Sequence, residues 1–165
     1  MSDDFTPKPE HRFTFGLWTV GNPGGEPFGE AVRAPLDTVE SVNRLAELGA
    51  YGVNFHDNDL LTAEAPATQR DAILARFTAA LDQTGLRVPM VTTNLFHRPV
   101  FKEGALTAND PAVRRFAVRK ALDAIDLGAE LGAGVFVMCG GREGVETDAA
   151  KNVGLALDRY KEGVD

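Results

Sequence analysis

A histidine and an aspartate in the stretch His56-Asp57-Asn58-Asp59 are the strongest candidates for acid–base chemistry in this sequence. They follow residues 51–55, an apolar run typical of a buried strand, so both stand where that strand ends. A carboxylate beside an imidazole can hold one ring N–H and leave the other nitrogen for proton transfer. Spacing alone also allows a purely structural pair of His56 and Asp59. A metal site is less favoured, because neighbouring ligands from one loop rarely complete a coordination shell.

Uncommon residues also stand at the ends of the other apolar runs, namely Trp18, Thr92, Phe96 and Cys139. Aromatic side chains such as Trp18 and Phe96 can cover the apolar face of a sugar ring and exclude water, or they can be ordinary core residues. Cys139 would need an activating base to act as a nucleophile, and a lone cysteine at a strand end is usually inert.

The apolar runs alternate with helical patterns along the whole chain after a polar tail of residues 1–12. Residues 13–19, 51–55, 88–94 and 135–138 predict strands, and residues 37–49, 68–84, 110–131 and 148–165 predict helices. Asp37 and Asp110 can cap the starts of two helices, with Glu40 completing a capping box, and Gly85 can end another.

Short apolar strands that alternate with regular helices predict a parallel α/β sheet with right-handed crossovers. Two architectures have this pattern: an open doubly wound sheet and an arc of a (β/α)8 TIM barrel. The strands recur about every 40 residues, so eight units would need about 320 residues, and barrels typically have about 250 or more. Residues 13–165 would then be about the first four βα units, a half-barrel. In both architectures ligands bind at the carboxyl ends of the strands.

The composition excludes several classes of protein. A share of 44% hydrophobic and 25% charged residues is ordinary for a soluble globular domain. A net charge of −7 disfavours nucleic-acid binding, because Lys and Arg supply most of the affinity for phosphates. No apolar run reaches the roughly 20 residues of a membrane span, and no secretory signal is visible. With a single cysteine, a cytoplasmic protein without an internal disulfide is expected.

A basic run lies in the third predicted helix and consists of Arg114, Arg115, Arg119 and Lys120. Interleaved acids and the overall negative charge favour a solvated face or a subunit contact over a nucleic-acid site. The glycine-rich segments contain neither a G-x-G-x-x-G nor a P-loop pattern, so nothing points to a nucleotide site.

Four stretches together resemble the N-terminal part of xylose isomerase, in the shorter class of that family. They are RFTFGLWTVG at 12–21, LAELGA leading to FHDNDL at 45–60, VPMVTTNLF with PVFK at 88–102, and GGREG at 140–144. Each stretch alone is a weak signal, but the match is collinear and covers the chain from about Pro9 to Asp165. The combination is therefore specific to this family.

The resemblance implies a metal-dependent aldose–ketose isomerase that interconverts xylose and xylulose, and also glucose and fructose. In it, His56 matches the histidine that assists opening of the sugar ring, and Asp59 matches the acid that orients it. It also implies substrate-pocket positions, which are Trp18, Thr92, Phe96, Cys139 and, reaching into a neighbouring subunit, Phe28. Three residues depart from the family: Cys139 and Asn22 replace tryptophans, and Asn54 replaces a threonine. The first two changes remove parts of the aromatic wall.

The family uses two divalent metal ions, usually Mg²⁺ with Mn²⁺ or Co²⁺ as substitutes, and it forms homo-oligomers, with four subunits. Its metal-binding carboxylates and its catalytic lysine lie on later strands, so the resemblance gives this chain no metal ligands. The expected partners are an aldose or ketose sugar, further copies of the chain and, for a fragment, a complementary C-terminal half.

Three hypotheses about the chain follow. It is an N-terminal fragment of a xylose isomerase, inactive alone; or a stand-alone half-barrel that pairs with itself as a scaffold or sugar-binding module; or an open four-stranded α/β domain with an unrelated small-molecule function. Self-pairing would cover strand edges that otherwise carry unpaired N–H and C=O groups. The collinear match favours the first hypothesis and makes the third the least favoured.

Overall fold

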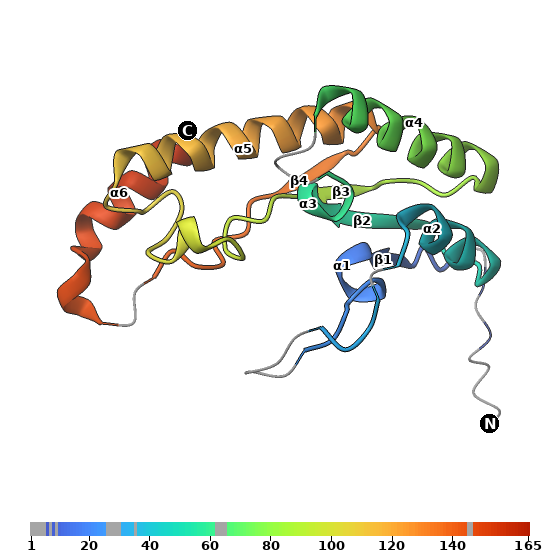
Figure 1. Cartoon of the computed structure of the whole chain (residues 1–165), viewed down its shortest axis with the longest axis horizontal. Coiled ribbons are helices and arrows are strands. Elements are labelled where there is room, and N and C mark those ends of the chain that lie inside the picture. The colour runs from blue at the N-terminus through green and yellow to red at the C-terminus, as the bar shows by residue number, and fades with distance from the viewer. Residues whose placement is uncertain are drawn as a thin grey trace.

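The computed structural model describes residues 6, 8, 10–25, 31–34, 36–61, 66–144 and 147–165. Four parallel strands form one sheet in the sequential order β1-β2-β3-β4 (Figure 1). The strands are β1 (Thr14–Gly16), β2 (Gly52–His56), β3 (Met90–Thr92) and β4 (Val135–Val137). A doubly wound sheet reverses its strand order at a switch point, whereas this order does not reverse. The sheet therefore has the arrangement of a barrel arc.

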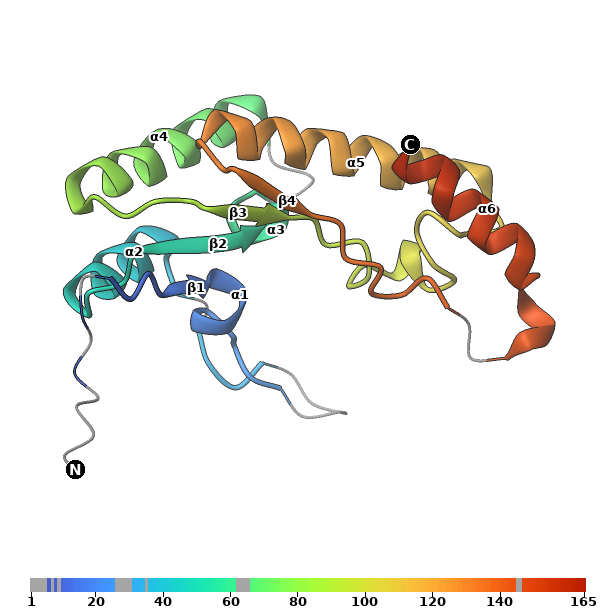
Figure 2. The same ribbon diagram turned by 180° about the vertical axis from the view of Figure 1, so that it is seen from behind.

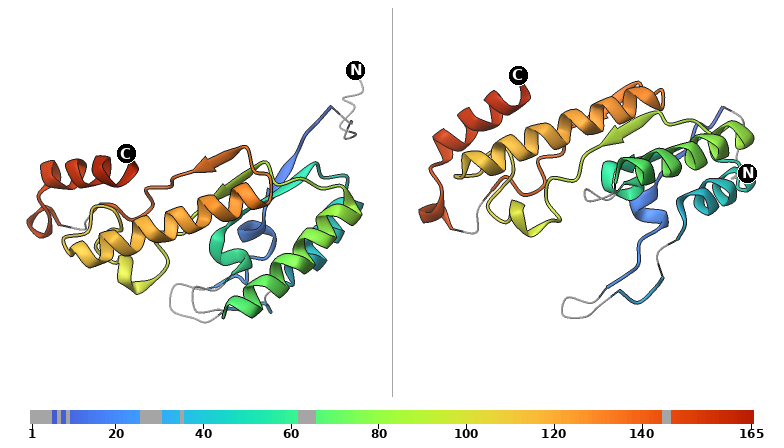
Figure 3. Two further views of the ribbon diagram at one scale, coloured as in Figure 1. Left: turned by 90° about the horizontal axis from the view of Figure 1, so that it is seen from above. Right: turned by 45° about the horizontal axis from the view of Figure 1, so that its top comes forward.

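Helices follow the strands along the chain. They are α1 (Leu17–Val20), α2 (Thr38–Glu47), α3 (Asp57–Leu60), α4 (Ala67–Thr84), α5 (Pro111–Glu130) and α6 (Val153–Val164), with short 3-10 segments at Pro99–Phe101 and Asp148–Ala150. The long helices α4 and α5 lie on the same side of the sheet (Figures 1 and 2). Helix α2 packs against α4 (Figure 3). No helix among the described segments is long and apolar enough to cross a membrane.

The two faces of the sheet differ in character. Side chains alternate along a strand, so Val53, Phe55 and Val91 share the face under the helices, and all three are fully buried there. The other face carries His56 and Thr92 in register, together with further polar side chains and two exposed valines of β4. The helix-covered face is thus the apolar core, and the opposite face presents polar groups.

A second core lies beyond the strand ends, where the segment between β3 and α5 packs against α5 and α6. Its buried members are Leu95, Phe101, Ala105, Leu106 and Ala117, with Phe116 and Tyr160 packed against them. In Figure 2 this part of the molecule extends away from the sheet along α5. It forms a rim beyond the carboxyl ends of β3 and β4.

Most expected elements are present, with three corrections. Asp37 and Asp110 cap α2 and α5 as predicted, each accepting a hydrogen bond from a first-turn N–H, and Gly85 ends α4 with φ of 73°. The Glu40 side chain pairs with Arg44 and does not complete the predicted capping box among the contacts of the described residues. Residues 17–19 were expected to continue the first strand, but together with Val20 they form α1 directly after Gly16. The last helix was expected to begin at Asp148.

That helix instead begins at Val153. Lys151 has extended backbone angles, with φ of −151° and ψ of 134°, and this separates the 3-10 turn at Asp148–Ala150 from α6. Asn152 then acts as the cap, because its side chain accepts a hydrogen bond from the Leu155 N–H at 3.0 Å. The sequence suggested a continuous helix because nothing local shows that the Lys151 side chain is buried.

Candidate active site

Three rings meet at the carboxyl ends of β1, β2 and β3. The Trp18 indole lies against the His56 imidazole with ring centroids 4.6 Å apart, and Phe96 approaches His56 with a centroid separation of 5.9 Å. Both contacts are edge-to-face. Adjacent parallel strands bring these residues together, since each follows or ends a strand at the same edge of the sheet. The structure therefore unites three of the residues selected from the sequence.

Glycines make room for the two aromatic walls. A Cβ atom at Gly16 would overlap the indole of Trp18, which folds back over its own strand end. A Cβ atom at Gly141 would lie 2.6 Å from Cδ1 of Phe96. Any larger residue at either position would displace the ring beside it. Gly141 also places the segment after β4 directly against the Phe96 ring.

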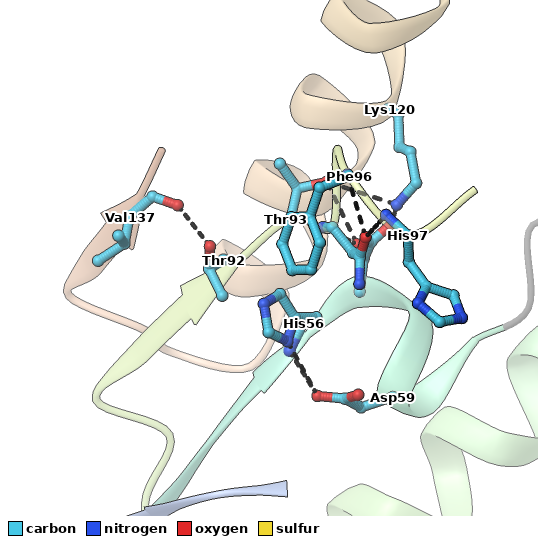
Figure 4. Close-up of polar contacts among 10 residues, drawn as sticks. His56, Asp59, Thr92, Thr93, Phe96, His97, Lys120 and Val137 are labelled. Carbon is cyan, nitrogen blue, oxygen red and sulfur yellow. Dashed lines mark hydrogen bonds and ion pairs between the residues drawn. The ribbon is translucent and has the colours of Figure 1, made fainter. Parts of the chain in front are cut away.

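Asp59 is oriented toward His56 as the sequence suggested (Figure 4). Its Oδ2 accepts a hydrogen bond from the backbone N–H of His56 at 2.8 Å and lies 3.5 Å from Nδ1 of the ring. The two side chains are largely buried, with exposed fractions of 12% and 16%. A carboxylate on this side orients the ring and leaves Nε2 as the nitrogen that faces away from Asp59.

Thr92 lies opposite His56 in the register of β2 and β3. Its hydroxyl donates to the carbonyl oxygen of Val137 at 2.6 Å, so it ties β3 to β4, and the side chain is 4% exposed. On β2, Asn54 donates from Nδ2 to the Thr14 hydroxyl at 2.7 Å, while its buried Oδ1 has no partner among the described residues. The pocket role expected for Thr92 stays a prediction.

Asp57, which the sequence did not single out, organises the turn beside His56. Its Oδ1 accepts hydrogen bonds from the Thr93 hydroxyl at 3.2 Å and from the Asn94 N–H at 3.0 Å. Its Oδ2 forms an ion pair with Nζ of Lys120 on α5. One carboxylate thus joins the ends of β2 and β3 to the long helix behind them.

The turn after β3 continues this network. The side-chain oxygen of Asn94 accepts hydrogen bonds from the backbone N–H groups of Phe96 at 3.2 Å and His97 at 2.9 Å. An Asn that bonds the backbone two and three residues ahead fixes a tight turn. The turn directs the Phe96 ring to His56, whereas the His97 side chain is exposed.

The basic run in α5 is therefore not uniformly a solvated face, and the expectation is wrong for Lys120. This lysine is 8% exposed and points to the strand ends, whereas Arg115 and Arg119 are exposed. Periodicity could not separate Lys120 from its neighbours, because its partner Asp57 stands 63 residues earlier in the chain. The one local signal that Lys120 is buried is its place on the same helical face as Ala117, Ala121 and Ala124.

A second buried lysine, Lys151, organises the rim. It donates to the Thr107 hydroxyl at 2.9 Å and to the carbonyl oxygens of Glu103 and Glu143. The Glu143 carboxylate accepts hydrogen bonds from three consecutive backbone N–H groups, those of residues 105–107, and from the Thr107 hydroxyl. The segment after β4 is thereby fastened to the segment before α5.

Burial lowers the pKa of Lys151 below its ordinary value of 10.5. The negative charges of Glu143 and Glu103 raise it in part, and the positive charge of Arg159 lowers it further. Desolvation is the larger effect because no carboxylate oxygen forms a direct ion pair with this ammonium group among the contacts of the described residues.

For two expected pocket residues the described part of the structure shows no contact with the three rings that would support the role. Cys139 follows β4 and is exposed. Phe28 falls outside the described residues. Within the described part of the chain, no three His, Cys, Asp or Glu side chains are grouped so that they could hold a metal ion. The resemblance places the metal ligands of the family on later strands, so the described residues are not expected to hold a metal ion by themselves.

Comparison with known proteins places the chain in a family. A model of the xylose isomerase-like TIM barrel family matches residues 42–165, and the chain belongs to this family. The predicted fold class is thereby confirmed, with four parallel strands alternating with helices as part of such a barrel.

The chain also matches part of a longer relative. The chain is 57% identical over 161 residues to the xylose isomerase of Thermus thermophilus. The match covers 98% of this chain and 42% of the Thermus protein, so the chain spans less than half the length of that relative. The resemblance to xylose isomerase is confirmed, and an isomerase-family relationship follows from it.

Proposed function

We propose that this chain supplies the ring-opening side of a xylose isomerase active site, in an enzyme that converts D-xylose to D-xylulose and also glucose to fructose. The observation that carries the proposal is the group formed by His56, Asp59, Trp18 and Phe96 at the strand ends. The identity to the Thermus xylose isomerase supports it.

His56 would carry the proton in the opening step. Opening a cyclic sugar breaks the bond from the anomeric carbon to the ring oxygen and forms the aldehyde, while a proton leaves the anomeric hydroxyl and reaches the ring oxygen. The imidazole of His56 can carry this proton on Nε2, because Asp59 occupies the Nδ1 side. Trp18 and Phe96 would pack against the apolar face of the sugar and exclude water.

We assign no step of the following hydride shift to this chain, because its described residues offer no metal cage. The Mg²⁺ ions of the proposed enzyme would be held by residues outside this chain, in a homo-oligomeric and cytoplasmic protein. Turnover by the 165-residue chain alone is therefore not expected.

A hybrid enzyme tests the proposal. In it, this chain replaces the part of the Thermus xylose isomerase that it matches, and conversion of D-xylose is measured with Mg²⁺ present. The proposal expects turnover by the hybrid and none by the isolated chain. A folded hybrid that binds xylose without converting it would contradict the proposal and favour the sugar-binding alternative.

A further inference from the structure

A series of contacts starts at the chain neighbour of His56 and returns to the His56 ring. Asp57, its neighbour in the chain, accepts a hydrogen bond from the Asn94 N–H, and the Asn94 side chain holds the N–H of Phe96. The Phe96 ring then returns to His56. The position of the imidazole therefore depends on how firmly Asp57 holds the turn that contains Asn94.

Lys120 is the group that keeps the Asp57 carboxylate in this position. The Asp57 side chain is 18% exposed, and Lys120, at 8%, is the cation paired with it. A largely buried carboxylate without a counter-charge turns toward water or takes up a proton. Either change would weaken the hydrogen bonds that Oδ1 accepts from Thr93 and Asn94.

We propose that Lys120 is a positioning residue for the ring-opening histidine: its ion pair with Asp57 fixes the turn that holds Phe96, and so fixes His56 between Phe96 and Trp18. Lys120 acts from α5, behind the strand ends, and its Nζ bonds Asp57 and Thr93. The inference rests on the proposed function for the role of His56, but the geometry that it predicts exists without turnover.

Trp18 provides a direct readout because it is the single tryptophan of the chain and contacts His56. A protonated imidazole in contact with an indole quenches its fluorescence. The 165-residue chain should therefore show a loss of Trp18 emission on acidification, which we call the acid quench. The quench measures ring contact, which a loss of stability alone does not alter while the protein remains folded.

The variants separate positioning from stability. Lys120→Met should abolish the acid quench, and Lys120→Arg should retain it because the charge remains. The matched control is Lys151→Met, which removes the other buried lysine and should leave the quench intact. Thr93→Val removes the hydroxyl that joins Asp57 and Lys120 without unpairing a charge, so it should reduce the quench even if Lys120→Met does not fold. Circular dichroism confirms that each variant is folded.

Three results would overturn the inference: full quench in folded Lys120→Met, full quench in folded Thr93→Val, or equal loss in Lys151→Met. An absence of quench in the unaltered chain would also overturn it, because the ring contact would then be missing. The readout requires no sugar and no metal. The quench pattern can therefore hold when the hybrid enzyme is inactive, and it can fail when the hybrid turns over xylose.

Discussion

Two lysines are buried in the described part of the chain, and they are held in different ways. Lys120 pairs directly with the carboxylate of Asp57, so a charge meets a charge. Lys151 donates hydrogen bonds to two backbone carbonyl oxygens and a hydroxyl, whereas the nearby Glu143 carboxylate accepts hydrogen bonds from backbone N–H groups. The first lysine holds side chains that surround His56, and the second fastens one rim segment to another. Burial of a lysine alone therefore does not show whether it supports the candidate site or joins two structural segments.

The largest expected difference is in the free energy of unfolding, because removing each lysine leaves a different group without its partner. Lys120→Met should lower the free energy of unfolding by about 3–5 kcal/mol, because it leaves the Asp57 carboxylate without compensation. Lys151→Met should cost about 1–3 kcal/mol, because its partners are mainly neutral oxygens. Urea unfolding followed by circular dichroism measures both values. An equal loss of unfolding free energy in the two variants would show that the two lysines are not held in different ways.

A substitution at Gly104 would disturb the hydrogen bonds around Lys151 while the lysine itself stays in the sequence. Its φ is +97°, and a Cβ there would lie 2.5 Å from Oγ1 of Thr107 and 2.8 Å from Nζ of Lys151. Gly104→Ala should therefore cost about 1–3 kcal/mol through strain and overpacking. Urea unfolding gives the loss, and the acid quench of Trp18 should be unchanged. A changed quench would show that the rim and the His56 region are coupled.

Asp37 contacts neither buried lysine, so its substitution gives a reference value for the loss of one helix cap. It caps α2 by accepting hydrogen bonds from the N–H groups of Val39 and Glu40. Asp37→Ala should lower the free energy of unfolding by about 1 kcal/mol and leave the Trp18 quench unchanged. A loss as large as that of Lys120→Met would show that the buried ion pair is not exceptional in this chain.

Asp37 also has a pH dependence of known sign. Partial burial raises its pKa, but hydrogen bonds from the Glu40 N–H and the Arg76 side chain outweigh this and hold the pKa below 3.8. The contribution of Asp37 is therefore present above pH 3.8 and is lost as the pH falls through the lowered value. The difference in unfolding free energy between the unaltered chain and Asp37→Ala should shrink in that acid range, and a constant difference would contradict this.

The smallest expected effect is the alkaline response of Lys151. Because burial lowers its pKa from 10.5, the unfolded chain binds more protons than the folded chain just below that pH. The stability of the unaltered chain should therefore rise relative to Lys151→Met as the pH increases through this window. Unfolding curves at several pH values below 10.5 measure the trend, and an opposite slope would show that desolvation does not dominate at this group.

The sequence predicted the order of strands and helices well, because each apolar run and each cap is a local signal. Asp37 and Asp110 act as caps, and β2 and β4 lie within one residue of the predicted ranges. The helix at Leu17–Val20 was missed, because its residue types also suit a strand. Local propensity therefore determined most of the fold but not the turn that carries Trp18.

The surroundings of the site were harder to predict. His56 and Asp59 stand close in the chain, so their pairing follows from spacing, and strand adjacency brings in Trp18 and Phe96. The ion pair of Asp57 with Lys120 joins residues 63 positions apart, and no periodicity shows which of the basic residues in α5 turns inward. Contacts of this kind depend on how distant elements pack.

The central claim is that His56 performs the ring-opening proton transfer, and one measurement tests it most directly. Turnover of D-xylose is compared in the hybrid enzyme carrying His56→Gln and in the hybrid carrying His97→Gln, whose altered side chain is exposed. We expect His56→Gln to lower kcat by about 10²–10⁴-fold, the usual contribution of a positioned acid–base group. His97→Gln should leave turnover unchanged. Equal turnover by the two variants would contradict the assignment of His56.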